Sequence, residues 1–193
     1  MKRKIPIYLD EQEQDLLLSQ PDLKYTKNGL RNYCMMLLML KAGLRCAEVL
    51  NLEITDINWS SGELKIREGK GQKDRIVWLN ETIIDFLRNY LEKKQDRQKL
   101  LFSSKYGNHV DSSYLRKMVK RYAKKAGIEK DIHPHTLRHT FATYFYRKTK
   151  NIRMLQKILG HSDISTTQIY THIVDHELEE EMKNFNKTED LPT

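Results

Sequence analysis

Residues 26–50 of the chain, TKNGLRNYCMMLLMLKAGLRCAEVL, determine the centre of the predicted fold. Apolar residues recur there at three- and four-residue spacing, which predicts an amphipathic helix over residues 26–42. Gly43 is its natural terminator, because glycine adopts the left-handed conformation that closes a helix. A second short helix is expected over 45–50, so Arg45 stands between two helices.

The stretch that follows changes from helical to alternating periodicity. The alternating segments lie at 57, 64–67 and 75–79, separated by glycine-containing turns at 60–62 and 69–72. This pattern predicts a small antiparallel meander of about three strands. Lys70 stands at the tip of its second turn.

Further helices are expected on both sides of the meander. Asp10 and Glu13 form a capping box that opens a short helix, and Asn80 caps a later one. Asp111 opens a helical pattern that Gly127 ends, and Asn151 opens one that Gly160 ends. A helix is also expected over 135–148, after His133-Pro134, and a turn-helix over 166–170. The predicted fold class is mainly α with a small antiparallel β-sheet (α+β).

The length and charge favour one domain that binds a polyanion. A chain of 193 residues can bury one substantial core, and the net charge of +8, with a pI near 9.3, favours nucleic acid as the partner. From position 175 onward the chain has seven acidic residues and only two lysines, so the rest of the chain is still more basic. We expect one folded domain over 1–174 and an acidic helix or tail over 175–193.

Neither secretion nor membrane insertion is supported. The first residues include basic side chains but no apolar segment of a signal peptide, and no window approaches about 18 apolar residues. Cys34 and Cys46 have neither disulfide-scaffold nor CxxC spacing, so they are expected to be core thiols. We expect a cytoplasmic protein without a membrane partner.

The helix expected over 111–127 carries a basic outer face. Its positively charged residues, with no acid among them, are Arg116, Lys117, Lys120, Arg121, Lys124 and Lys125. Such a face can follow DNA phosphates, whereas the alternative is an ordinary solvated surface.

Two short patterns could carry chemistry on a phosphate. His135 and Arg138 are three residues apart and share one helix face; a guanidinium grips phosphate oxygens and an imidazole exchanges protons near neutral pH. His135 and His139 also have zinc-protease spacing, but Thr136 stands where that motif needs glutamate. No metal or other cofactor is therefore expected.

The second pattern places His161 directly after Gly160, with Tyr170 nine residues later. Gly160 alone is explained as a helix terminator, and Tyr170 alone as packing. The same segment could also form a helix-turn-helix that binds DNA without reacting.

Taken in order, these patterns resemble the tyrosine recombinase (phage integrase) family over nearly the whole chain. The matching segments are IPIYLDEQEQDLLL at 5–18, AGLRCAEVLNL at 42–52, GKGQKDRIVWL at 69–79, PHTLRHTFAT at 134–143 and LGHSDISTTQIYTH at 159–172. Each motif alone is weak, but five in the family's order are specific. The resemblance implies the family's catalytic-domain fold over 1–174.

The resemblance implies roles for six catalytic residues, Arg45, Lys70, His135, Arg138, His161 and Tyr170. The two arginines would hold the phosphate oxygens with a third hydrogen bond from His161, and Tyr170 would attack. His135 is the candidate base for Tyr170, and Lys70 would protonate the departing 5′ oxygen. Glu48 would orient Arg45, or form a simple surface ion pair.

The resemblance also implies a site-specific DNA recombinase that works through a 3′-phosphotyrosyl link, without metal or ATP, as a homo-oligomer of up to four copies on double-stranded DNA. Alternatives are a type IB topoisomerase-like relaxase and a DNA-binding regulator without catalysis. The family's N-terminal core-binding domain is expected to be absent from this chain. Leu178, Met182 and Phe185 give the acidic helix an apolar stripe that could pack on a neighbouring protomer or on its own domain.

Overall fold

The computed structural model describes residues 6–24, 26–67, 74–94, 98–104 and 108–188. Its elements are α1 (Glu11–Leu18), α2 (Lys27–Ala42), α3 (Cys46–Asn51), η1 (Ile54–Asp56), β1 (Glu63–Ile66), β2 (Arg75–Trp78), α4 (Glu81–Lys93), α5 (Ser112–Lys125), α6 (Pro134–Thr149), α7 (Ile152–Leu159), η2 (Ile164–Thr166) and α8 (Ile169–Thr188). The predicted fold class, mainly α with a small antiparallel sheet, is confirmed.

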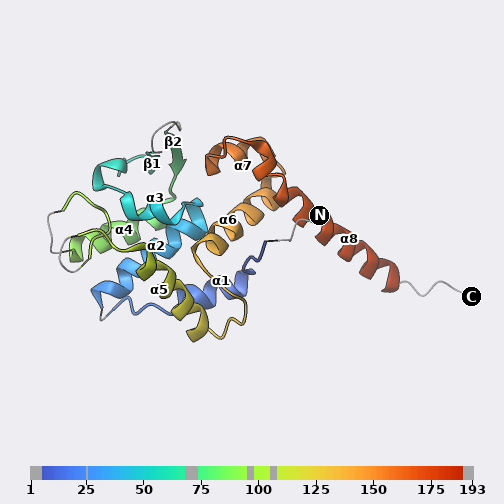
Figure 1. Cartoon of the computed structure of the whole chain (residues 1–193), viewed down its shortest axis with the longest axis horizontal. Coiled ribbons are helices and arrows are strands. Elements are labelled where there is room, and N and C mark those ends of the chain that lie inside the picture. The colour runs from blue at the N-terminus through green and yellow to red at the C-terminus, as the bar shows by residue number, and fades with distance from the viewer. Residues whose placement is uncertain (1–5, 25, 68–73, 95–97, 105–107, 189–193) are drawn as a thin grey trace, which may run out of the picture.

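Helix α2 lies at the centre and packs against α4 and α6. Met35, Met36 and Met39 are all fully buried, so α2 is covered on more sides than one apolar stripe would require. Thr26 caps its start by accepting a hydrogen bond from the Gly29 backbone N–H. The helix ends where predicted, and Figure 1 shows the other helices arranged around it.

The chain turns sharply after α2 because Gly43 adopts a left-handed conformation with φ of +68°. A β-carbon at this position would lie 2.4 Å from a ring carbon of Phe141 on α6. Glycine is therefore required twice, for the turn and for the close approach of α6. The turn delivers Arg45 to the N-cap of α3.

The predicted three-stranded meander is wrong by one strand. Among the described residues the sheet has two antiparallel strands, with Glu63 opposite Trp78 and Ile66 opposite Arg75. Ile57 makes only an isolated bridge to Leu64. The physical reason is that η1 ends immediately before Ile57, and the tight turn from residue 58 to 62 follows at once, which leaves no length of extended chain to pair. Residues 68–73, and with them Lys70, lie outside the described residues.

The end of the chain also differs from its prediction. The turn-helix expected over 166–170 is divided: η2 ends at Thr166, and Tyr170 lies in the first turn of α8. Helix α8 runs without a break across the expected boundary between 174 and 175. In Figure 1 it extends away from the body of the molecule beyond α6 and α7.

A small second cluster of buried residues forms where α6, α7 and α8 meet. It consists of Ala142, Leu155, Leu159, Tyr170 and Ile173. Because α7 begins at the predicted Asn151 cap and ends at Gly160 in a left-handed conformation, the chain reverses there and brings α8 back onto α6. This arrangement places Tyr170 within packed structure.

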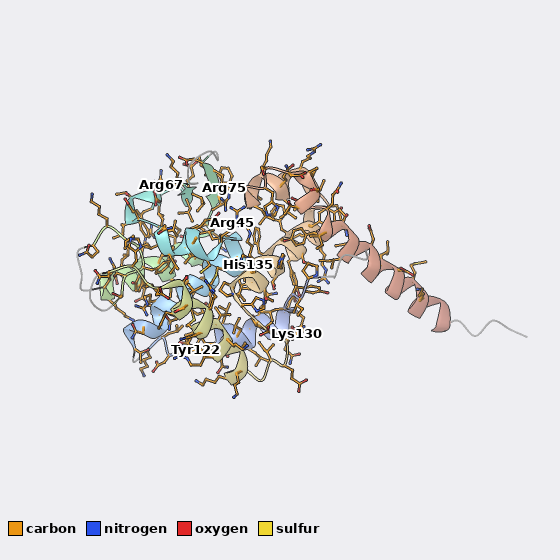
Figure 2. All side chains as sticks on the ribbon, in the orientation of Figure 1. Arg45, Arg67, Arg75, Tyr122, Lys130 and His135 are labelled. Atoms are coloured by element: carbon orange, nitrogen blue, oxygen red, sulfur yellow. The ribbon has the colours of Figure 1, made fainter. Side chains whose placement is uncertain are left out.

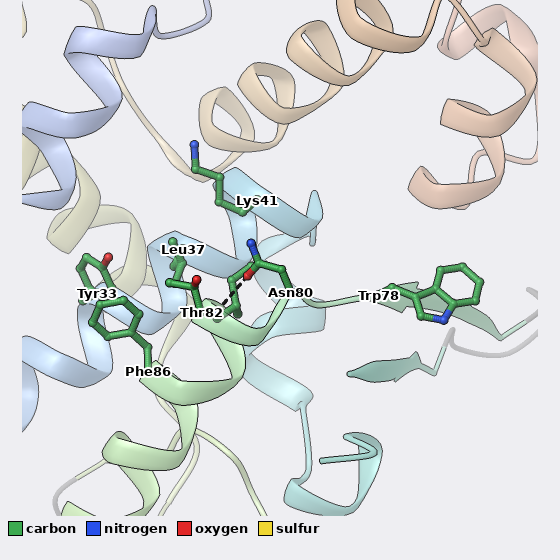
Figure 3. A pocket seen from close by; sticks show the side chains of 8 residues that line it. Tyr33, Leu37, Lys41, Trp78, Asn80, Thr82 and Phe86 are labelled. Carbon is green, nitrogen blue, oxygen red and sulfur yellow. Dashed lines mark hydrogen bonds between the residues drawn. The ribbon is translucent and has the colours of Figure 1, made fainter. Parts of the chain in front are cut away.

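On the other side of the molecule, α2, α4 and β2 border a pocket of about 350 Å³. Figure 3 shows Lys41, Leu37, Tyr33 and Phe86 around it, with Trp78 extending outward. Trp78 is 65% exposed.

Cys34 and Cys46 are free thiols, the first buried and the second half-buried. Within the described residues no helix is long and apolar enough to cross a membrane.

Candidate active site

Arg138 lies on the buried face of α6, in the turn after Pro134 begins the helix. Its side chain is only 5% exposed, and its guanidinium donates to the backbone carbonyls of Gly43 and Leu159, both at 2.6 Å. Burial, followed by the positive charge of Arg45, lowers the guanidinium pKa to about 10. Arg138 is therefore still charged at neutral pH, in surroundings that contain little water.

Arg45 reaches the same place from a distant part of the chain. Its guanidinium donates to the Gly160 carbonyl at 3.2 Å, next to the Leu159 carbonyl that Arg138 binds. The C-terminal end of α7 attracts cations, because the last carbonyls of a helix lack intrahelical partners and carry partial negative charge. The two guanidiniums thus converge on consecutive carbonyls. Figure 2 labels Arg45 and His135 near the middle of the molecule.

Glu48 lies between three arginine side chains. Its Oε1 accepts from Arg45 at 2.6 Å and from Arg75 at 2.9 Å, and its Oε2 accepts from Arg75 at 2.8 Å. Burial raises the pKa of this carboxyl, but the hydrogen bonds and charge of Arg75, the Arg45 backbone N–H and the charge of Arg138 together hold it below its ordinary value. Glu48 is therefore ionised, and its contact with Arg45 has the geometry that the predicted orienting role needs.

Arg75 is a residue that sequence reasoning missed. The sequence pattern predicts only a strand position for it, yet its side chain is buried, as is that of Val77, while Ile76 and Trp78 are exposed. The available signal was the alternation itself, since an arginine at an inward strand position needs a buried partner. That partner is Glu48.

His161 follows Gly160 and contacts Arg138. Its Nε2 lies 3.2 Å from the Arg138 guanidinium, and its Nδ1 lies 3.0 Å from the Thr167 hydroxyl. Because a guanidinium only donates, Nε2 accepts and the ring proton is on Nδ1. Burial, then the charges of Arg138 and Arg45, lower the His161 pKa to about 4, so the ring is neutral at pH 7.

Tyr170 is 1% exposed and stands next to this group of charges. Burial raises the phenol pKa to about 12, although the charge of Arg138 opposes the shift. The phenol oxygen lies 2.7 Å from Nδ1 of His139. Burial, then the charges of His135 and Arg138, lower the His139 pKa to about 4, so this ring is neutral and its Nδ1 can accept a hydrogen bond from the phenol hydroxyl.

The histidine against the phenol is therefore His139, which sequence reasoning considered only as a metal ligand. His139 follows Arg138 directly and so lies on an adjacent face of α6, turned toward α8. No feature of the sequence alone distinguished it from His135, because the choice depends on which side of α6 receives α8.

His135 is exposed and lines a pocket of about 990 Å³. Arg45 and Arg116 also line this pocket. Burial, then the charge of Arg138, lower its pKa from the ordinary value. It therefore lies on the solvent-exposed side of Arg45. The predicted role of His135 as base requires Tyr170 to reach this pocket.

The remaining predicted site residues are Lys70 and the basic residues of α5. Lys70 lies outside the described residues. On α5, Lys120 pairs with Asp131 at 3.2 Å and Arg121 lies over the Tyr122 ring. Across the described ranges no group of three His, Cys, Asp or Glu side chains could hold a metal ion.

These side chains can together bind one phosphodiester. Two guanidiniums supply fixed donors to the non-bridging oxygens, and His161 can add a donor once its Nε2 is protonated, which a nearby phosphate charge favours. Tyr170 supplies a nucleophilic oxygen at the edge of the same group. With Tyr170 released from its buried position, these groups are suited to phosphoryl transfer to a phenol.

The comparisons with known proteins agree with this chemistry. A model of the phage integrase family matches residues 8–177. Tyrosine recombinase XerD of Staphylococcus epidermidis is 39% identical over 178 residues, which cover 89% of this chain and 60% of the relative. A tyrosine recombinase of Pseudothermotoga lettingae is 40% identical over 178 residues, 92% of this chain and 60% of the relative. The chain thus spans about 60% of the length of these curated relatives.

Solved structures give the same result. The crystal structure of XerA recombinase matches with a TM-score of 0.81 and 36% identity, over 95% of this chain and 66% of the other. XerH site-specific recombinase, in a post-cleavage complex with its palindromic difH substrate, matches with a TM-score of 0.82 and 31% identity, over 95% and 54%. The catalytic domain of bacteriophage HP1 integrase, with a TM-score of 0.66 and 24% identity over 97% and 99%, shares the fold. The chain belongs to the phage integrase family.

Proposed function

We propose that the chain is the catalytic part of a site-specific DNA recombinase, which cleaves and rejoins strands through a 3′-phosphotyrosyl link to Tyr170. The observation that carries this proposal is the convergence of Arg45 and Arg138 on consecutive carbonyls beside His161, with Tyr170 in the adjoining cluster. The names of the relatives and the post-cleavage DNA complex of XerH support it.

In the proposed reaction the Tyr170 oxygen attacks the phosphorus and the bond to the 5′ oxygen breaks. Arg45, Arg138 and His161 stabilise the charge that develops on the non-bridging oxygens. The phenol proton passes to a base, for which His135 is the candidate because it lines the pocket with Arg45. The departing 5′ oxygen takes a proton, with Lys70 as the candidate donor. Attack by a 5′ hydroxyl on the phosphotyrosyl ester reverses these steps without ATP.

The resting position of Tyr170 requires a movement before the attack. At 1% exposure the phenol cannot meet a DNA phosphate, and its hydroxyl is held by His139. Residues 160–168 link α7 to α8 through the short η2 turn, and most of their side chains are at least partly exposed. A shift of this linker and the first turn of α8 would carry Tyr170 toward the arginines.

The DNA backbone is proposed to follow one row of α5. Arg116, Lys120 and Lys124 are spaced by four residues and so share one side of the helix. Arg116 lines the pocket that contains Arg45, and Lys120 and Lys124 line a second pocket of about 590 Å³. The row therefore leads away from the phosphate site. Lys117, Arg121 and Lys125 form a second row on the outer face.

Helix α8 is proposed to pack on a second copy of the chain bound to the same DNA, in an assembly of up to four copies. It extends from the body, and Leu178 and Met182 are 58% and 52% exposed four residues apart. Removal of the residues after His176 should impair assembly on DNA more than single-strand nicking. Equal loss of both activities would contradict the role in assembly. We propose that the protein acts in the cytoplasm, because its proposed substrate is DNA.

The decisive experiment is a covalent-adduct assay. The probe is a pool of nicked duplexes with randomised sequence around the nick, so that a cut fragment diffuses away and attached DNA can be recovered and sequenced. We expect a denaturant-resistant adduct through a 3′ phosphate, lost in Tyr170→Phe. Reversible binding alone would indicate a regulator. With an intact recovered site, relaxation of supercoils without recombinants would indicate a relaxase.

A further inference from the structure

Arg75 connects the small sheet to two neighbours of the phosphate-binding arginines, the Glu48 carboxylate and the C-terminal end of α7. It lies on β2, and its side chain is 7% exposed. Its Nε donates to the Ile158 carbonyl at 2.6 Å, and its two terminal nitrogens donate to the two oxygens of Glu48 at 2.9 and 2.8 Å. A planar guanidinium that binds a carboxylate in this forked way is held in one orientation.

The three carbonyls at the end of α7 form a series. Ile158 accepts from Arg75, Leu159 accepts from Arg138, and Gly160 accepts from Arg45. Each guanidinium thus arrives from a different element, β2, α6 and the start of α3, at successive residues of one helix end. The positions of the two phosphate-binding arginines depend on the placement of this end, and Arg75 attaches it to the sheet.

Arg75 also changes how the negative charge of Glu48 is shared among the arginines of the site. Among the described residues, the guanidiniums of Arg45, Arg75 and Arg138 lie around the carboxylate of Glu48, and Arg75 contacts both carboxylate oxygens. Arg138 lies farther from Glu48, at 3.7 Å. With Glu48 occupied by Arg75, the charge of Arg138 is less engaged internally and more available to a phosphate. Without Arg75, the buried carboxylate would draw Arg138 toward itself and would engage Arg45, which is already 2.6 Å away, more fully.

We propose that Arg75 is a positioning residue for strand cleavage: it occupies Glu48 and anchors the end of α7, and thereby keeps Arg45 and Arg138 directed at the scissile phosphate. This inference rests on the proposed function. Arg75 touches neither the phosphate nor the nucleophile in this role. It acts through Glu48 and the Ile158 carbonyl.

The test compares Arg75→Met with the double variant Arg75→Met/Glu48→Gln. The probe is a nicked duplex recovered from the covalent-adduct pool, used at saturating concentration in single-turnover cleavage. Arg75→Met should slow cleavage by roughly 10- to 100-fold, because a displaced arginine loses its alignment with the phosphate. The double variant no longer carries the competing carboxylate, so cleavage per folded molecule should recover by about tenfold. DNA affinity, measured by anisotropy, should change less than the rate.

Arg67→Met is the matched control. Arg67 follows β1 and pairs with Glu53 and Asp56 at 3.3 and 2.5 Å, and Figure 2 shows it beyond Arg75 on the sheet side. It is an arginine in an ion-pair group of the same sheet, but it is 51% exposed and its ion pairs are with Glu53 and Asp56 rather than with residues of the phosphate site. Its replacement should leave the cleavage rate unchanged.

The outcomes separate the two proposals. If the wild-type chain forms no adduct, the proposed function and this inference both fail. If it forms the adduct and folded Arg75→Met cleaves at the wild-type rate, or the double variant is no faster than the single one, only this inference fails. Should Arg75→Met not fold, Arg75→Lys decides, because a lysine keeps the charge but cannot fork. A wild-type cleavage rate in Arg75→Lys overturns the positioning role.

Discussion

Replacing Tyr170 and His139 by phenylalanine, singly and together, measures how firmly the protein holds its nucleophile in the resting position. The hydroxyl and Nδ1 are 2.7 Å apart, and Tyr170 is 1% exposed. Each single replacement removes one partner and leaves the other unpaired and poorly hydrated, which costs about 1–3 kcal/mol. The lower end of this range applies to Tyr170→Phe, because the partner that it leaves unpaired, His139, is only half-buried.

The double replacement removes both polar partners and keeps two aromatic rings, which in the wild type are 5.8 Å apart and tilted by 48°. It should therefore cost less than the sum of the single replacements, with a coupling free energy of about 1–2 kcal/mol. Urea denaturation of the four proteins gives this value, and each kcal/mol corresponds to about 2–4 °C in Tm for a chain of this size. Strict additivity, with coupling below about 0.5 kcal/mol, would refute the reasoning.

The single replacement His139→Phe should also change the rate of DNA cleavage. Loss of a bond worth about 1 kcal/mol should raise the population of released Tyr170 about fivefold. His139→Phe should therefore form the DNA adduct up to about fivefold faster in a single turnover, if release limits the rate. A tenfold slower adduct in a folded variant would instead show that His139 assists removal of the phenol proton.

Three further predictions concern the turn, the pH dependence and the DNA surface. Gly43→Ala should lower the free energy of unfolding by at least about 1 kcal/mol in urea denaturation, because its φ is +68° and the new methyl group would meet Phe141; unchanged stability would contradict the structure. Burial lowers the pKa of both His139 and His161 to about 4, so the unfolded chain takes up protons there that the folded chain does not, and stability should decline as pH falls from about 6.5 toward about 4. A flat stability profile over that interval, measured by urea denaturation, would oppose this. Arg116→Gln should reduce the slope of log binding constant against log salt by about one unit, and Lys117→Gln by less; equal slopes would remove the preference for the row beside the pocket.

Local features of the chain were predictable from the sequence. Asp10, Asn80, Asp111 and Asn151 each cap the helix that they were expected to open, because a capping hydrogen bond involves residues only two or three positions apart. The missing third strand shows the limit of such patterns. One apolar residue at Ile57 fits an alternating pattern, but pairing needs a length of extended chain that the neighbouring turns do not leave.

The members of the candidate site could be named from their ordered motifs and the family resemblance, but their contacts could not. Whether Arg45 and Arg138 meet depends on how α7 packs against α6 and β2, and no local pattern encodes that arrangement. The same holds for Arg75, whose importance depends on Glu48, and for His139, whose partner Tyr170 is brought by the reversal at Gly160.

The sequence alone determined the helices before residue 160 and their caps, the basic charge and the identity of the residues suited to phosphate chemistry, since periodicity, capping and side-chain chemistry are properties of neighbouring residues. Only the tertiary structure decided which histidine holds the phenol, that the phenol is buried at rest, and that three arginines share the end of one helix. Those facts follow from packing among elements distant in the chain, where burial and the nearest charge set the partner and pKa of each group.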